Sequence, residues 1–374
     1  MTDTPLTRAL LVLAGFSTFA GACDRATGAG EATPLLVPSG ARILASGQQS
    51  PVSIAVDGTN VYWLTLGTTS KLIPTGKSPY LHSGGQVLAC AISGCMNAPL
   101  VLASGRTQTD RQLPVPLVTD GTNVYWSDQT PLSAGGLFSC SVDGCNDSPQ
   151  MIGSALPEAM AIYGGALFWT ELAAEVYTCP VSDCGAPTAL WSAGNSPCAT
   201  GVVADASGVY WPTVATESIM KCAAGGCANA PTVVMSTDSA IAGEVAALEQ
   251  ITTDADHVYF TDGNPQIGMI LACAKSGCGP QPILLAGGLN APMAIATDGV
   301  DVYWTETGEA FVNGQSINGA GLVRRCAVGG CNGAPVTIAS GLTAPVGIAV
   351  DDNNVYWAEA GTGAADGRIW IAPK

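Results

Sequence analysis

The stretch DGTNVYW occurs twice in this sequence, at residues 57–63 and, letter for letter, at residues 120–126. An internal repeat of this kind indicates a fold built from similar units. The last three letters recur along the chain, each time as an aliphatic residue followed by two aromatic ones. Seven copies, spaced 42 to 63 residues apart, lie at residues 61–63, 124–126, 167–169, 209–211, 258–260, 302–304 and 355–357.

Each copy lies in a unit of four short predicted strands. An apolar segment and a turn of Gly, Asp or Asn precede it, and in six units a strand with the pattern C-x4-C and a fourth apolar segment follow it. Strands rich in β-branched and aromatic residues, separated by turn residues, indicate an all-β fold. Four antiparallel strands repeated radially are typical of propeller blades. The sequence therefore predicts a seven-bladed β-propeller with four-stranded antiparallel blades.

The two ends of the repeat region predict how the ring closes. The seventh unit has only three strands before Lys374, whereas residues 41–47 (ARILASG) match the fourth-strand pattern ahead of the first unit. We expect this N-terminal strand to complete the last blade, because an open ring would expose unpaired strand edges. Residues 41–374 are thus predicted to form a single propeller domain.

Four of the repeated strands resemble the YWTD-type propellers of the low-density-lipoprotein receptor family. The resemblance rests on YWSD at 125–128, FWTE at 168–171, YFTD at 259–262 and YWTE at 303–306. It implies a propeller, and a structural role between blades for the acidic residue that ends the motif. The sequence departs from that family in having seven units rather than six and in its repeated cysteines, so the resemblance favours the fold more than a receptor-like ligand.

The N-terminal segment is typical of an export signal. Arg8 is followed by an apolar run and then by small residues ahead of Cys23, and the run is too short for a spanning helix. The ending FAGAC resembles the lipobox of bacterial lipoproteins, although Ala20 stands where that pattern prefers Leu. We expect a signal peptide over residues 1–22, a lipid on Cys23 and a flexible tether over 23–40, hence a protein of the outer membrane or periplasm. The alternative is a plain secretory signal and a secreted protein.

Charge and cysteine content narrow the function classes. The net charge is −16 with only 13 basic residues, which argues against nucleic-acid binding. The paired cysteines flank four-residue turns between strands three and four, within disulfide reach, whereas a zinc site would need two pairs from different blades. We predict six disulfides: Cys90–Cys95, Cys140–Cys145, Cys179–Cys184, Cys222–Cys227, Cys273–Cys278 and Cys326–Cys331.

One further cysteine, Cys198, has no partner once Cys23 is lipidated. Its two interpretations are a buried free thiol and a reactive thiol that would need a base, for which the chain offers only His82 and His257. We favour the buried thiol.

A ring of carboxylates is the remaining candidate for chemistry. Five units carry Asp or Glu two residues after the second aromatic residue, and the other two carry Thr65 and Thr213. A ring of such oxygens could bind a divalent cation such as calcium, or each carboxylate could accept hydrogen bonds within the scaffold, the alternative we favour. The five candidates are Asp128, Glu171, Asp262, Glu306 and Glu359. The turn between the first and second strands of a unit is called its one–two turn. The aspartates of these turns, such as Asp57, are interpreted as turn formers.

The predicted topology divides the propeller into two faces. The one–two turns and the cysteine turns fall on one face, whereas the long insertions at 64–86 and 305–321 fall on the other, where variable loops on a rigid scaffold usually bind ligands. We expect a monomeric, non-catalytic binding or scaffolding propeller that meets a protein or glycan of the cell envelope and touches the membrane only through its lipid. The alternative is a divalent-cation-dependent propeller enzyme, similar to lactonases or hydrolases, with its site in the central channel. A purely structural component of an envelope complex is a third possibility.

Overall fold

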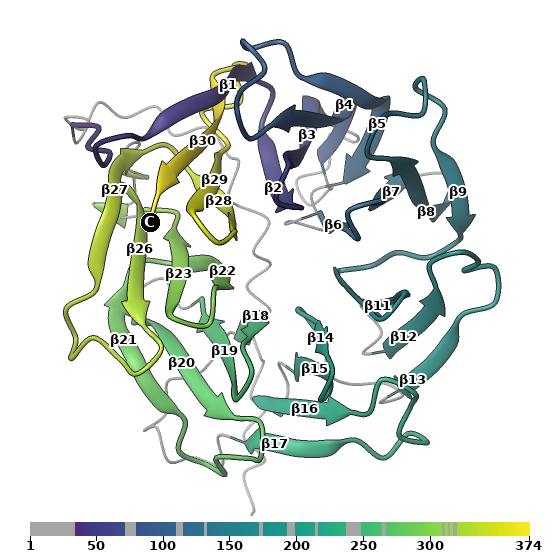
Figure 1. The fold of residues 1–374 in the computed structure, drawn as a ribbon, viewed down its shortest axis with the longest axis vertical. Helices are drawn as coiled ribbons and strands as arrows, with labels where there is room; N and C mark the ends of the chain where they lie inside the picture. The colour runs from purple at the N-terminus through teal and green to yellow at the C-terminus, as the bar shows by residue number, and fades with distance from the viewer. Residues whose placement is uncertain are drawn as a thin grey trace, which may run out of the picture.

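The computed structural model arranges the chain as a closed ring of seven four-stranded antiparallel sheets (Figure 1). This confirms the predicted all-β, seven-bladed β-propeller. Within the part of the chain that the structure describes, no helix is long and apolar enough to cross a membrane. The described residues are 34–71, 80–109, 115–130, 133–171, 175–192, 199–213, 216–236, 248–263, 267–308, 311–312, 315–316 and 320–374.

The strands follow one another from the inside of each blade to the outside. Blades 1 to 3 consist of β2 (Pro51–Val56), β3 (Asn60–Lys71), β4 (Tyr80–Ala91) and β5 (Leu100–Thr109); β6 (Leu117–Thr119), β7 (Asn123–Thr130), β8 (Ser133–Ser141) and β9 (Gln150–Gly153); and β10 (Ala159–Tyr163), β11 (Ala166–Glu171), β12 (Glu175–Pro180) and β13 (Thr188–Ser192).

Blades 4 to 6 continue the same order. They consist of β14 (Val203–Asp205), β15 (Gly208–Thr213), β16 (Ser218–Cys222) and β17 (Thr232–Ser236); β18 (Leu248–Thr253), β19 (His257–Asp262), β20 (Gly268–Ala274) and β21 (Ile283–Leu289); and β22 (Pro292–Thr297), β23 (Asp301–Glu306), β26 (Gly321–Ala327) and β27 (Val336–Leu342). A short hairpin, β24 (Phe311–Val312) with β25 (Gln315–Ser316), lies in the β23–β26 connection.

Blade 7 joins the two ends of the sequence. It consists of β28 (Pro345–Val350), β29 (Asn354–Glu359), β30 (Gly367–Pro373) and, on the outside, β1 (Arg42–Gln48). β1 pairs antiparallel with β30, from Arg42 opposite Ile371 to Gln48 opposite Gly367, and Figure 1 shows the two strands side by side. The predicted closure by an N-terminal strand is confirmed.

The repeated Tyr-Trp pair forms the core between blades. The two residues point to opposite faces of a strand, and each side chain is fully buried; for example, Tyr62 and Trp63 are both 0% exposed. The first aromatic residue of each blade packs in one cluster with the second aromatic residue of the next blade. The seven combinations are Tyr62 with Trp126, Tyr125 with Trp169, Phe168 with Trp211, Tyr210 with Phe260, Tyr259 with Trp304, Tyr303 with Trp357, and Tyr356 with Trp63.

Blade 1 is longer than the others. β3 and β4 each have 12 residues and β5 has 10, whereas the second strands of blades 3 to 7 have six. The additional pairs run from Gly67 opposite Gly84 to Lys71 opposite Tyr80, and β5 follows β4 as far as Thr109 opposite Leu81. Three strands of blade 1 therefore continue past the disc on the face opposite the one–two turns. We call residues 67–71, 80–84 and 106–109 the blade 1 extension.

Candidate functional site

The aspartates of the one–two turns are bound on both carboxylate oxygens. In blade 1 the Oδ1 of Asp57 accepts hydrogen bonds from the amides of Thr59 and Asn60 at 2.9 and 2.8 Å, and its Oδ2 accepts one from the Tyr62 hydroxyl at 2.6 Å. The corresponding tyrosine-to-aspartate bonds of four other blades measure 2.5 to 3.1 Å, between Tyr125 and Asp120, Tyr259 and Asp254, Tyr303 and Asp298, and Tyr356 and Asp351.

These bonds shift the protonation of both partners. Burial opposes the charge of Asp57, but the hydrogen bonds from Tyr62 and the turn amides outweigh it and hold the pKa of Asp57 below its ordinary value. Burial together with the bond to Asp120 raises the pKa of Tyr125 to about 12. The repeated DGTNVYW stretch is thus a turn and a core tyrosine that fix each other. The bond from tyrosine to aspartate was not predicted from the sequence, although the constant spacing of five residues between the two was visible there.

Two of the predicted strand-end carboxylates are surrounded by scaffold donors. Glu306 accepts the indole N–H of Trp304 at 3.1 Å and the amide of Asn290 at 3.0 Å, and lies 3.3 Å from Arg324. Glu359 accepts the amide of Thr343 at 2.8 Å and the indole N–H of Trp370 at 2.9 Å, beside Arg368. Both side chains are almost fully buried.

The other three carboxylates differ in their partners. Glu171 accepts the indole N–H of Trp169 at 3.0 Å. Asp128 forms an ion pair with Arg106, whose guanidinium lies 5.1 and 4.6 Å from the ring centres of Trp126 and Phe138. Burial lowers the pKa of Arg106 to about 10.

The fifth carboxylate, Asp262, is 0% exposed and lies beside Glu249. Among the described residues, no group of three or more His, Cys, Asp or Glu side chains is placed to share a metal ion. The five carboxylates thus lie on five separate blades. Glu171, Glu306, Glu359 and Asp128 each contact donors of the scaffold.

Glu249 is a titratable residue that the sequence interpretation missed. Burial, with the negative charge of Asp262 as a second cause, raises the pKa of Glu249 to about 7. The residue before it, Leu248, begins β18 and pairs with Asp262 at the end of β19. The only signal in the sequence was an acidic residue at the start of an inner strand, in register with a strand-end carboxylate.

Residues in or next to the inner strands of all seven blades line a central cavity of about 170 Å³. Among the described residues that line it, Glu158 is the charged one, and Ser53 and Gln250 are the polar side chains; the others are mainly aliphatic, such as Ile54 and Ile348. None of the five strand-end carboxylates belongs to this lining. The side chains of the cavity therefore offer one carboxylate and few other polar groups.

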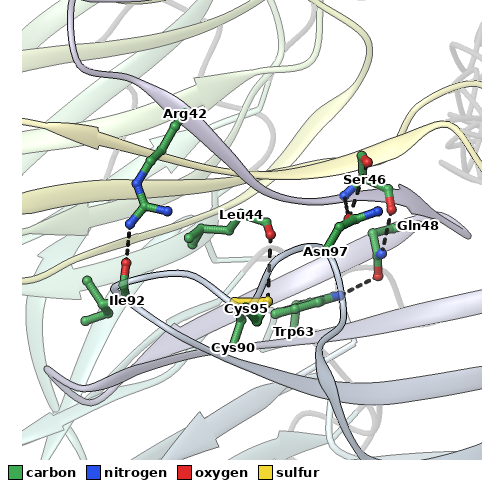
Figure 2. The surroundings of a disulfide bond; sticks show 9 residues. All are labelled: Arg42, Leu44, Ser46, Gln48, Trp63, Cys90, Ile92, Cys95 and Asn97. Atoms are coloured by element: carbon green, nitrogen blue, oxygen red, sulfur yellow. Dashed lines mark hydrogen bonds between the residues drawn. A yellow bond between two sulfur atoms is a disulfide. The ribbon is translucent and has the colours of Figure 1, made fainter.

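The six cysteine pairs lie at disulfide distance, with Cα–Cα separations of 5.1 to 5.5 Å. Each hairpin also reaches the outer strand of the preceding blade. In Figure 2 the Sγ of Cys95 lies 3.7 Å from the carbonyl oxygen of Leu44, and Asn97 accepts the amide of Ser46 at 2.7 Å. We call each of these six cysteine hairpins a clasp; in three of them an Asn or Asp two residues after the second cysteine accepts an amide of the outer strand. The sequence interpretation predicted the pairs but missed this contact between blades. In three of the six hairpins the Asn or Asp two places after the second cysteine was the available signal.

Several predicted features lie outside the described residues. These are Cys23, Cys198, the signal peptide and residues 72–79, 309–310, 313–314 and 317–319 of the long insertions. His82 is 2% exposed on β4, and the Nδ1 of His257 lies 4.0 Å from Asp254. The end of the segment predicted to be a flexible tether, residues 34–40, is described and lies against blade 6, where Leu36 pairs with Ser340.

The comparisons with known proteins concern the fold. No protein-family model and no curated protein sequence matches the chain. The WD40 β-propeller domain of Doa1 is similar over 90% of this chain and 97% of its own, with 10% identity and a TM-score of 0.56. The computationally designed Ika8 protein is similar over 88% of this chain and 99% of its own, with 14% identity and a TM-score of 0.52. These similarities show a propeller fold. They show nothing finer.

A third structure, that of the Nidogen/Laminin complex, is similar over 75% of this chain and 84% of the matched chain, with 15% identity and a TM-score of 0.40. That score is too low to support a closer relationship. The resemblance to YWTD-type propellers thus stays a prediction from the sequence motifs.

Proposed function

We propose that the protein is a non-catalytic binding or scaffolding propeller that is exported to the bacterial cell envelope and held there by a lipid on Cys23. We further propose that it binds a protein or glycan through the face that carries the insertions at 64–86 and 305–321, which we call the long-loop face. The observation that carries this proposal is the blade 1 extension, a three-stranded platform on the long-loop face. Strands hold a binding surface more rigidly than loops do.

The base of the blade 1 extension supports this interpretation. All three strands pass from blade to extension through glycine: Gly67, Gly84 and Gly105 have φ values of 79°, 75° and 67°. A Cβ on Gly67 would lie 2.3 Å from the carbonyl oxygen of Ser83, so a larger residue does not fit there. The pairing register shifts at this level between Ser83 and Gly85. Such bulges re-aim the strands that follow them.

The test compares the full protein with a variant in which residues 68–83 are replaced by Asn-Gly, a two-residue hairpin turn. Both are immobilised and exposed to envelope proteins and to purified peptidoglycan. We expect one of these materials to bind the parent protein and not the shortened variant. The control Val300→Ser, on the opposite face and 69% exposed in the parent, should bind normally. Equal binding by the shortened variant, or binding by neither protein, would overturn the proposal.

The second candidate, a divalent-cation-dependent hydrolase, is favoured by one observation: Glu249 and Asp262 place two carboxylates together at the inner end of blade 5. The measurement that separates the candidates is the metal content of the purified protein, with its melting temperature in calcium and in EDTA. A stoichiometric metal that is lost in Glu249→Gln supports the hydrolase. A metal-free protein whose melting is the same in both buffers supports the binding module.

A further inference from the structure

Six of the seven seams between blades are covered by a cysteine hairpin. The hairpin leads from the third to the fourth strand of one blade and lies on the outer strand of the preceding blade; Cys145, for example, lies 3.3 Å from the carbonyl oxygen of Leu102. The seam between blades 6 and 7 has no such hairpin, because the third and fourth strands of blade 7, β30 and β1, are not consecutive in the chain.

At four of the covered seams the same backbone amide of the outer strand is bound by the hairpin. At three of them a serine amide donates to the side chain two residues after the second cysteine: Ser46 to Asn97, Ser104 to Asp147 and Ser192 to Asn229, at 2.7, 2.6 and 2.8 Å. At the fourth the amide of Ser236 donates to the backbone carbonyl of Gly279 at 3.4 Å. At the seam between blades 6 and 7 the corresponding amide, that of Ser340, donates to the carbonyl oxygen of Leu36 at 2.9 Å.

Residues 34–38, which we call the strap, therefore occupy the place of a seventh clasp. Leu36 also donates its own amide to the carbonyl oxygen of Ser340 at 3.0 Å. A turn from Pro38 to Ala41, with Gly40 at a φ of 88°, leads from the strap into β1. Beyond this one bridge the strap is held loosely, since Leu35, Leu36 and Val37 are 45%, 66% and 36% exposed.

We propose that the strap is a releasable seventh clasp, and that the ring opens first at the seam between blades 6 and 7 when the strap lifts. The other clasps are each stapled by a cysteine pair at disulfide distance, whereas the strap is held by backbone hydrogen bonds at a single residue. Local opening starts where few apolar contacts are buried and hydrogen bonds lie near solvent.

Two glycines provide a matched test. Gly341 and Gly105 both follow the seam serine and have similar backbone conformations, with φ values of 75° and 67°. A Cβ on Gly341 would lie 2.6 Å from the carbonyl oxygen of Pro34 in the strap, whereas a Cβ on Gly105 would meet nothing within 4 Å. Gly341→Ala and Gly105→Ala therefore introduce the same backbone strain, and only Gly341→Ala displaces the strap.

The readout is amide hydrogen exchange, followed for residues 34–48 and 336–342 of the full protein. We expect Gly341→Ala to accelerate exchange in both segments by about tenfold or more relative to the parent, and Gly105→Ala to leave them unchanged. In the parent protein the Ser340 amide should exchange faster than those of Ser104 and Ser192, a comparison that needs no variant. Protection of Ser340 equal to that of Ser104, or equal effects of the two glycine variants on these segments, would overturn the proposal.

Discussion

The hydroxyl of Tyr62 donates to the Oδ2 of Asp57 at 2.6 Å, and this bond joins the turn that begins β3 to a side chain of the core between blades 1 and 2. Because Tyr62 packs with Trp126 of the next blade, the turn of one blade helps to position the surface of its neighbour. The same pair of interactions recurs in blades 2, 5, 6 and 7. The turn at Asp57 therefore contributes to the packing between blades 1 and 2.

We expect Tyr62→Phe to lower the free energy of unfolding by about 1 to 2 kcal/mol, because it removes the hydrogen bond and leaves a partly buried carboxylate oxygen without its donor. Chemical denaturation of the parent and the variant measures this difference. Tyr163→Phe is the control, since Tyr163 is 40% exposed at the end of β10 and should lose little. Equal effects of the two substitutions would contradict the structural role of the bond.

Asp298 should make folding sensitive to acid. Burial alone would raise the pKa of Asp298. The turn amides of Asp301 and Val300 and the ammonium of Lys374, 2.6 Å away, outweigh burial and lower the pKa to about 2. Since the ordinary value of 3.8 applies to the unfolded chain, this stabilisation is present above about pH 4 and is lost as the pH falls to about 2. Asp298→Asn should flatten the dependence of unfolding free energy on pH in that interval, whereas Asp352→Asn, in an exposed turn, should not. Parallel curves for Asp298→Asn and the parent would refute this prediction.

Glu249 should make the folded protein less stable as the pH rises, the opposite of the effect of Asp298. Its pKa is raised to about 7 from an ordinary 4.5, so the folded protein favours the protonated carboxyl and loses stability as the pH rises through this range. Glu249→Gln, which cannot ionise, should be more stable than the parent at pH 8, by the order of 1 kcal/mol, and similar to it at pH 4. Thermal unfolding at the two pH values tests this. A variant that is less stable at pH 8 would show that the charged form is needed.

The cysteine hairpins should contribute modestly to stability. The double substitution Cys140→Ser with Cys145→Ser opens a very short loop, so we expect a loss of about 2 kcal/mol. Because this clasp holds Ser104 through Asp147, exchange of the Ser104 amide should accelerate as well. A peptide map under non-reducing conditions should link each cysteine to the one five positions away. A different linkage would contradict the observed pairing of strands three and four.

Most of the fold was predictable because each unit repeats the same alternation of buried residues. The two aromatic residues of every second strand must both be buried, which requires a neighbour on each side, and residues 41–47 matched the missing outer strand. The blade 1 extension was not predictable, since its backbone pairs over a segment without apolar alternation, GTTSK, that reads as a loop.

The contacts of the candidate site residues were harder to predict from the sequence than the fold. The strand-end carboxylates were found by their spacing, but their partners come from other strands, as Asn290 and Arg324 do for Glu306. Glu249 gave no sequence signal apart from its position, because its pKa depends on burial and on Asp262 across the sheet. The role of Leu36 at a seam depends on its backbone, which no side-chain pattern encodes.

The pairing of one aromatic residue with the next around the ring has a consequence for the order of the chain. The contact that joins the last blade to the first, Tyr356 with Trp63, is of the same kind as the contacts between blades adjacent in sequence. No blade is therefore first in the packing. A circular permutant that links Lys374 to residue 34 and begins between β9 and β10 should assemble the same ring, with the strap then fixed at both of its ends.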